Sequence, residues 1–194
     1  FTHNDLHASN IMFVETKEVY LYYVYNDIVY RVPTYNKIFK IIDFGRAIYN
    51  VKDKLFYSDN FLKDEDAHTQ YNFGPIYDET KEKVENNFSF DLSRLGCSLY
   101  DYFNEEEFDN HKNKEALLDI ISKWCSDDKD KNLLYNKKGD ERYPDFKLYR
   151  MIAKTVHHCV PQDQLENPLF KQFILKDNKI KNKPFVMNID ENIK

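Results

Sequence analysis

A tyrosine-rich segment near the amino terminus constrains the fold of this chain more than any other feature. The runs V-Y-L-Y-Y-V-Y, residues 19–25, and I-V-Y-R-V, residues 28–32, are rich in β-branched and aromatic residues. Such residues favour β-strands, and the Asn26-Asp27 pair between the runs favours a tight turn. The segment therefore predicts a β-hairpin over residues 19–32.

A short apolar strand is expected on each side of this hairpin, and each strand joins a polar segment. Residues 1–10, F-T-H-N-D-L-H-A-S-N, lead into a strand at residues 11–14. A second strand, I-F-K-I-I at residues 38–42, ends on D-F-G at residues 43–45, where the glycine permits a sharp turn. If the two strands pair, their polar ends converge.

Three oxygen-bearing side chains then face one point: Asp5, Asn10 and Asp43. Carboxylate and amide oxygens suit Mg²⁺, which proteins bind through one or two carboxylates together with substrate phosphates. Asn10 and Asp43 are the expected metal ligands, and Asp5 remains as a base or orienting group for an incoming hydroxyl. This arrangement predicts phosphoryl transfer, in which positioning and charge neutralisation supply nearly all the catalysis.

The composition is that of an ordinary globular protein. Of the 194 residues 42% are hydrophobic and 16% aromatic, which excludes wholesale disorder. The net charge of −5 gives no general attraction to nucleic acid or to anionic membranes, so neither is an expected partner. No apolar run approaches the roughly 20 residues that cross a bilayer. Cys97, Cys125 and Cys159 have no C-x-x-C spacing, which favours a reducing compartment and predicts a cytoplasmic location.

The rest of the chain is expected to be mainly helical. A long irregular connection spans residues 46–88, and so long a connection is usually functional or mobile. Apolar residues at helical spacing then predict a helical region over residues 90–175, followed by a Lys- and Asn-rich tail over 176–194. The expected helices begin near Phe90 and cover about 114–124, 146–159 and 167–175, and an edge strand is expected at 184–189. The fold class is therefore α+β, with no visible domain boundary.

Three motifs resemble the protein-kinase-like superfamily. H-N-D-L-H-A-S-N, residues 3–10, is similar to its catalytic loop H-R-D-x-x-x-x-N, and I-I-D-F-G to its metal-binding D-F-G segment. D-L-S-R-L-G, residues 91–96, resembles the D-x-W-S-x-G that opens the long buried helix of the carboxyl-terminal lobe. The resemblance covers roughly residues 1–125, and more narrowly the run resembles serine/threonine kinases of large DNA viruses.

This resemblance implies the carboxyl-terminal, catalytic lobe of a serine/threonine protein kinase that uses ATP with Mg²⁺ or Mn²⁺ on a protein substrate. A viral kinase of this kind would lie in the host cytoplasm or the virion. The resemblance implies that Asp5 and Asn10 are catalytic and that Asn10 and Asp43 bind the metal. It implies that His7, Asp43 and Gly45 bind the nucleotide. The residues implied as structural support are His3, Phe44, Asp91 and Gly96. Asp91 is expected to hold the backbone of the catalytic loop, and His3 to pack on Phe44.

The departures from the family pattern leave alternatives open. Asn4 stands where protein kinases often carry the arginine that receives an activation-loop phosphate. His7 replaces the usual lysine, and D-L-H also occurs in haspin-like, aminoglycoside and related small-molecule kinases. The alternatives are a small-molecule kinase of the aminoglycoside or choline type and a non-catalytic pseudokinase or binding lobe. Only two residues precede His3, so the glycine-rich loop and the nucleotide-binding lysine are expected in an amino-terminal lobe absent from this chain.

Two further segments have competing interpretations. His157-His158-Cys159 resembles a metal-binding cluster, but consecutive residues on the expected helix fan out by about 100° each, which predicts that they do not share an ion. The tyrosine-rich hairpin is interpreted either as a flap packed on the lobe or as a docking surface.

Overall fold

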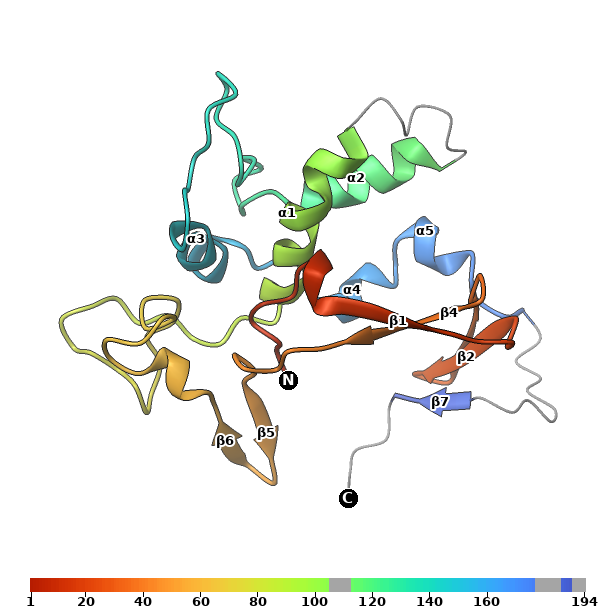
Figure 1. Cartoon of the computed structure of the whole chain (residues 1–194), viewed down its shortest axis with the longest axis horizontal. Helices are drawn as coiled ribbons and strands as arrows, with labels where there is room; N and C mark the ends of the chain where they lie inside the picture. The colour runs from red at the N-terminus through yellow and green to blue at the C-terminus, as the bar shows by residue number, and fades with distance from the viewer. Residues whose placement is uncertain (105–112, 177–185, 190–194) are drawn as a thin grey trace. The chain divides into compact units, whose positions relative to one another are not determined.

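The computed structural model describes residues 1–104, 113–176 and 186–189, and it is a mixed α+β structure (Figure 1). Contacts divide the chain into two compact units. The first holds Phe1–Ile11 and Ile41–Asp163, and the second holds Met12–Lys40 and the chain from Gln164 onward. The sequence shows no boundary between them because each unit is assembled from segments that are distant along the chain.

The second unit contains the expected hairpin. Strands β2 (Tyr20–Tyr25) and β3 (Ile28–Pro33) are antiparallel, with Tyr20 opposite Pro33 and Tyr25 opposite Ile28. Asn26 and Asp27 both have left-handed backbone angles, with φ of 47° and 59°, as a two-residue hairpin turn requires. The hairpin prediction is confirmed.

Two other segments extend this unit. Strand β7 (Val186–Asn188) pairs parallel with β2 and lies within the expected edge strand at 184–189, of which residues 184 and 185 lie outside the described residues. Helix α5 (Pro168–Lys171) is shorter than the expected 167–175, because the chain leaves the helix and bonds to β3. Leu175 donates its amide to the carbonyl of Val29 at 2.8 Å.

Strands β1 (Ile11–Glu15) and β4 (Lys37–Ile41) pair in a two-stranded sheet, as expected for strands that flank a hairpin. Just beyond the strands, the amide of Ile42 donates to the carbonyl of Asn10 at 3.0 Å. This bond brings the segment that ends in D-F-G beside the end of the polar amino-terminal segment. The convergence of the two polar segments is therefore confirmed.

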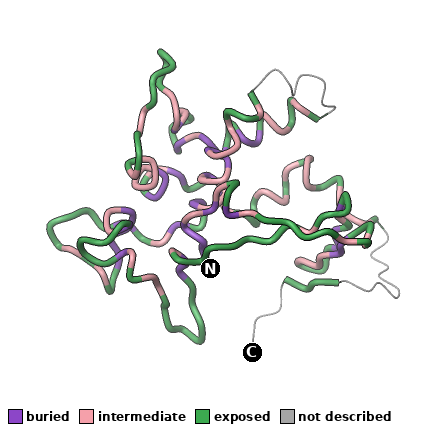
Figure 2. Tube along the Cα trace, viewed as in Figure 1, coloured by how far each residue is buried: buried purple, intermediate pink, exposed green. Residues whose placement is uncertain are grey.

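The main helices of the first unit are α1 (Phe90–Asn104), α2 (Lys114–Trp124) and α3 (Lys147–Thr155), and a short α4 (Pro161–Gln164) follows. Helices α1 and α2 pack closely at Gly96, where a Cβ atom would lie 2.7 Å from Cβ of Trp124. Figure 2 shows buried residues along this region, and the largest fully buried apolar side chains include Phe61, Phe90, Ile48, Ile120, Leu133 and Ile152.

The long connection at residues 46–88 is irregular, as predicted, but it is not a loose loop. It carries a small hairpin of β5 (Tyr49–Val51) and β6 (Lys54–Phe56) and a 3₁₀ turn at Asp59–Phe61. Its aromatic residues Phe61, Tyr71 and Phe73 are each at most 3% exposed. These buried side chains thus hold the segment in place within the first unit.

Helix α3 ends at Thr155, not at Cys159 as predicted, because Val156 has an extended backbone. His157 and His158 therefore lie beyond the helix, and the geometric reason for separating them was wrong. Both imidazoles contact Asp128, through Nδ1–Oδ distances of 2.6 Å and 3.3 Å. Within the described ranges, no group of three or more His, Cys, Asp or Glu side chains is arranged to hold a metal ion. No described helix combines the length and apolarity needed to cross a bilayer.

Candidate active site

Asp91, in the first turn of α1, holds the backbone of the polar amino-terminal loop. Its two carboxylate oxygens accept hydrogen bonds from the amide of His3 at 2.7 Å and the amide of Asn4 at 2.8 Å. Burial raises the pKa of Asp91, and the two amide bonds oppose that rise by favouring the carboxylate. This is the contact that the sequence predicts for Asp91, across 87 and 88 residues of chain.

His3 joins this loop to the segment that contains Asp43. Its side chain is 1% exposed, its Nε2 lies 2.8 Å from the carbonyl oxygen of Ile42, and its ring centroid lies 5.0 Å from that of Phe44. The packing of His3 on Phe44 agrees with the expected structural role. Both polar segments thus share one internal support.

Asn4 is fully buried, and its side chain bonds within the loop and to residues of the 46–88 segment. Its backbone is left-handed, with φ of 63°, and its Nδ2 donates to Oγ1 of Thr2 at 3.0 Å and to the carbonyl of Arg46 at 3.1 Å. The hydroxyl of Tyr71 donates to Oδ1 of Asn4 at 2.7 Å. An arginine could not occupy this enclosed position without disrupting these bonds.

Asp5 follows Asn4 and presents its carboxylate to three side chains. The hydroxyl of Tyr149 donates to Oδ1 at 2.5 Å, Nη1 of Arg46 lies 3.5 Å from Oδ2, and Nε2 of His7 lies 3.7 Å from Oδ1. Burial and the bond to Asp5 raise the pKa of Tyr149, so its hydroxyl keeps its proton at neutral pH. The hydroxyl of Tyr149 and the guanidinium of Arg46 thus hold the carboxylate of Asp5.

Tyr149 was not predicted as a site residue. Its ring stacks on Phe146 at 5.0 Å between centroids, and the guanidinium carbons of Arg94 and Arg46 lie 5.0 Å and 5.5 Å from its ring centroid. These contacts fix the ring so that its hydroxyl reaches Asp5. No local sequence signal identifies such a residue, because it lies 144 positions away from its partner.

Asn10 and Asp43 supply the two expected metal-binding oxygens. Nδ2 of Asn10 donates to the backbone carbonyl of Asp5 at 3.0 Å, which leaves its side-chain oxygen as a possible ligand. Asp43 is exposed and left-handed, with φ of 62°, and its Oδ1 accepts the amide of Gly45 at 3.3 Å. One carboxylate and one amide oxygen fit Mg²⁺, which takes its remaining ligands from phosphates and water.

His7 and Gly45 lie beside these oxygens. Burial, together with the positive charge of Arg94, lowers the pKa of His7 below its ordinary value of 6.5, although the charges of Asp5 and Asp43 oppose this. His7 is therefore mainly neutral at pH 7 and can donate one hydrogen bond. A Cβ at position 45 would lie 3.2 Å from Oδ1 of Asp43. Because Gly45 has no side chain, the carboxylate of Asp43 has room at this place.

No protein-family model, no curated protein and no solved structure matches this chain.

Proposed function

We propose that this chain is the catalytic lobe of an ATP- and Mg²⁺-dependent phosphotransferase, a serine/threonine protein kinase that acts on a protein hydroxyl. The observation that carries the proposal is the bonding of Asp91 to the amides of His3 and Asn4. Two motifs that lie 87 and 88 residues apart in the sequence thus meet in space, and the segment with the third, I-I-D-F-G, joins them through the contact of His3 with Ile42. Chance matches of short motifs give no reason for such contacts.

Each site residue has a role in this proposal. Asp5 accepts or orients the proton of the substrate hydroxyl, while Tyr149 and Arg46 hold its carboxylate in position. Asn10 and Asp43 hold the metal. When bound, Mg·ATP supplies the transferable phosphoryl group and the charge that neutralises it. Neutral His7 donates a hydrogen bond toward that phosphate. The lysine that orients the nucleotide would come from an amino-terminal lobe in cis.

A protein substrate is favoured over a small molecule by residues 46–88. This segment is fixed through the buried residues Phe61, Tyr71 and Phe73, so it offers a persistent surface beside the loop that carries Asp5. Tyr71 connects the two directly through its bond to Asn4. A small-molecule kinase has no need of so long an ordered segment, although His7 is shared with that class.

One observation favours a non-catalytic lobe as the second candidate. The Oδ1 atom of Asp5 already accepts the hydroxyl of Tyr149, and a substrate hydroxyl must approach the remaining oxygen beside Arg46. In a pseudokinase or binding lobe, the bond between Tyr149 and Asp5 would persist, and nucleotide would bind without phosphoryl transfer.

A phosphoryl-transfer assay separates these functions. The complete polypeptide that contains these residues is incubated with Mg²⁺, γ-labelled ATP and a mixture of acidic and basic protein substrates. We expect label on serine or threonine, and we expect Asp5→Asn and Asp43→Asn each to reduce transfer at least about a hundredfold, as the loss of a catalytic group or metal ligand does.

The matched control is Asp53→Asn, since Asp53 is exposed in the turn between β5 and β6 and has the same charge. It should leave transfer unchanged. Nucleotide binding without label transfer in the parent protein would support the binding lobe, and label on an aminoglycoside or choline but not on protein would support the small-molecule kinase.

A further inference from the structure

A pocket of about 810 Å³ lies in the first unit, between residues 61–84 and helix α3. Buried Phe61, Tyr71 and Val84 supply apolar lining. Positively charged side chains also line it: Lys63, Lys81, Arg150 and Lys154. The pocket is therefore suited to a side chain with an apolar stem and a polar end.

Two links join this pocket to the candidate active site. Tyr71 lines the pocket and donates its hydroxyl to Asn4, the residue before Asp5, at 2.7 Å. Arg150 also lines the pocket and follows Tyr149, whose hydroxyl bonds to Asp5. The pocket lining therefore includes one residue that bonds to the loop of Asp5 and one that is adjacent in sequence to the hydrogen-bond donor of Asp5.

The charges that line the pocket do not all cancel. Nζ of Lys81 lies 3.3 Å from Asp78, and Nζ of Lys154 lies 2.8 Å from Glu82, so these two lysines are paired. In the portion of the chain that the structure describes, Lys63 and Arg150 have no carboxylate within ion-pair distance. Nε of Arg150 is shielded from solvent and has no hydrogen-bond acceptor. The positive charge of the Arg150 guanidinium thus has no carboxylate partner among the described side chains, and an anionic ligand in the pocket would supply one.

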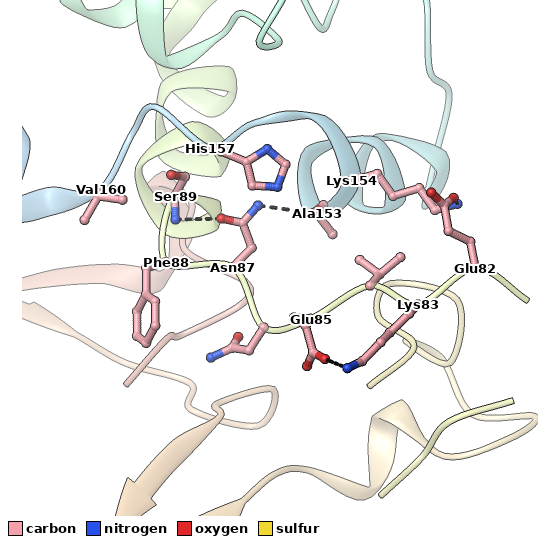
Figure 3. A pocket seen from close by; sticks show the side chains of 12 residues that line it. Glu82, Lys83, Glu85, Asn87, Phe88, Ser89, Ala153, Lys154, His157 and Val160 are labelled. Atoms are coloured by element: carbon pink, nitrogen blue, oxygen red, sulfur yellow. Dashed lines mark hydrogen bonds and ion pairs between the residues drawn. The ribbon is translucent and has the colours of Figure 1, made fainter. Parts of the chain in front are cut away.

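A neighbouring pocket, drawn in Figure 3, differs from this one in its balance of charges. It measures about 450 Å³ and is lined by residues 82–89 and by side chains from α3 and the segment after it. Its two lysines are both paired, Lys83 with Glu85 at 2.5 Å and Lys154 with Glu82 at 2.8 Å. That pocket has no surplus lysine charge for an anion, whereas the four lysine and arginine residues that line the larger pocket outnumber its three carboxylates, Asp78, Glu79 and Glu82, by one.

We propose that Arg150 and Lys63 bind an anionic side chain of the protein substrate, close to the hydroxyl that Asp5 receives. This inference rests on the proposed function, and it names the substrate class as proteins with an acidic or phosphorylated residue near the acceptor. The guanidinium group binds carboxylates and phosphates through paired hydrogen bonds, and the more exposed Lys63 adds a second positive charge to the pocket lining.

Peptide binding to the 194-residue chain, without nucleotide, tests the proposal. Fluorescein-labelled peptides are identical except for one position near a serine, which is phosphoserine, glutamate, glutamine or lysine. By fluorescence anisotropy, we expect the phosphoserine and glutamate peptides to bind at least about tenfold tighter than the glutamine peptide, as one hydrogen bond to a charged group allows. Their ratio distinguishes a phosphate from a carboxylate as the preferred ligand.

Variants assign the effect to the two cations. Arg150→Gln and Lys63→Gln should each remove most of the preference for anionic peptides, and Arg150→Lys should retain part of it. Lys138→Gln, the same charge change at an exposed residue that does not line the pocket, should retain all of it. Lys63 is exposed, so its variant tests the site even if Arg150→Gln lowers the melting temperature.

Equal binding of the glutamate and glutamine peptides, or an undiminished preference in both glutamine variants, would overturn the anion site. The proposed function fails separately. If the anionic peptides bind as expected but the complete polypeptide transfers no label, the site stands and the kinase assignment falls. If transfer occurs equally well to all four peptides, the kinase assignment stands and the anion site falls.

Discussion

The hydroxyl of Tyr149 donates a hydrogen bond of 2.5 Å to the carboxylate of Asp5, although the two residues are 144 positions apart in the chain. Asp5 is the proposed acceptor of the substrate proton, and the stacking of Tyr149 on Phe146 keeps this donor in place. The bond therefore sets the orientation of the carboxylate before any substrate arrives.

Tyr149→Phe removes this bond and keeps the ring. We expect kcat of the complete polypeptide to fall about tenfold with little change in KM for ATP, because a hydrogen bond to a charged group contributes about 1.5 kcal/mol. Tyr135→Phe is the matched control, since the hydroxyl of Tyr135 donates to exposed Asp101 at 2.8 Å, in a tyrosine–aspartate pair outside the site. Steady-state kinetics of both variants measure kcat and the KM for ATP. A rise in kcat for Tyr149→Phe would show that the bond blocks Asp5.

Asp91→Ala should destabilise the fold, because it leaves the amides of His3 and Asn4 without their acceptors. The expected loss in the free energy of unfolding is about 3 kcal/mol, from two shielded donors at roughly 1–3 kcal/mol each. Asp43→Asn, which keeps a side chain that tolerates the left-handed backbone at this exposed position, should cost less than about 0.5 kcal/mol. Urea unfolding measures both values, and equal midpoints for Asp91→Ala and the parent chain would refute the structural role of Asp91.

Gly96→Ala should also destabilise the first unit, because the added methyl would lie 2.7 Å from Cβ of Trp124. Separating α1 from α2 to relieve this contact costs about 1–3 kcal/mol, as overpacking does in other cores. Gly74→Ala is the control, since a Cβ at that position meets no atom within 4 Å. If thermal unfolding places both variants at the parent's melting temperature, the close packing of the two helices is wrong.

His7 should make stability depend on pH in a defined direction. Burial and the charge of Arg94 lower the pKa of His7 in the folded chain below its ordinary 6.5. Between the pKa of His7 in the folded chain and 6.5, the unfolded chain binds the proton more readily than the folded chain does. The contribution of His7 to stability is therefore complete above pH 6.5 and is lost as the pH falls through the pKa in the folded chain. The free energy of unfolding should therefore fall more between pH 7.5 and pH 5 in the parent than in His7→Gln. An NMR titration midpoint for His7 above 6.5 would contradict this.

Several features of the fold were predictable because their causes are local. The hairpin at residues 19–32 follows from strand-forming residues around a turn at Asn26-Asp27, and the pairing of β1 with β4 follows from the hairpin between them. The bounds of α2 agree with the expected 114–124 because apolar spacing alone indicates that helix. The contacts of Asp91 and His3 were predictable only through the resemblance to a family.

Other features depend on long-range contacts that no local pattern encodes. The end of α3 at Thr155 was missed because residues beyond it are held by bonds to Asp128, which replace helical ones. Asn4 appeared as a missing arginine, whereas its role is to bond with Tyr71 and Arg46. Tyr149 had no signal at all, since its position depends on the packing of α3 against the loop at Asp5.

Paramagnetic relaxation tests whether Asn10 and Asp43 bind one metal–nucleotide group beside Asp5. Mn²⁺ with a non-hydrolysable ATP analogue is titrated into the isotopically labelled protein, and NMR line broadening is recorded residue by residue. We expect the signals of Asn10, Asp43 and His7 to broaden first and Asp43→Asn to abolish the effect, while the signal of Asp128, with its two histidine contacts, is unaffected. Broadening centred on Asp128, or none at Asn10 and Asp43 when the nucleotide is bound, would contradict this expectation.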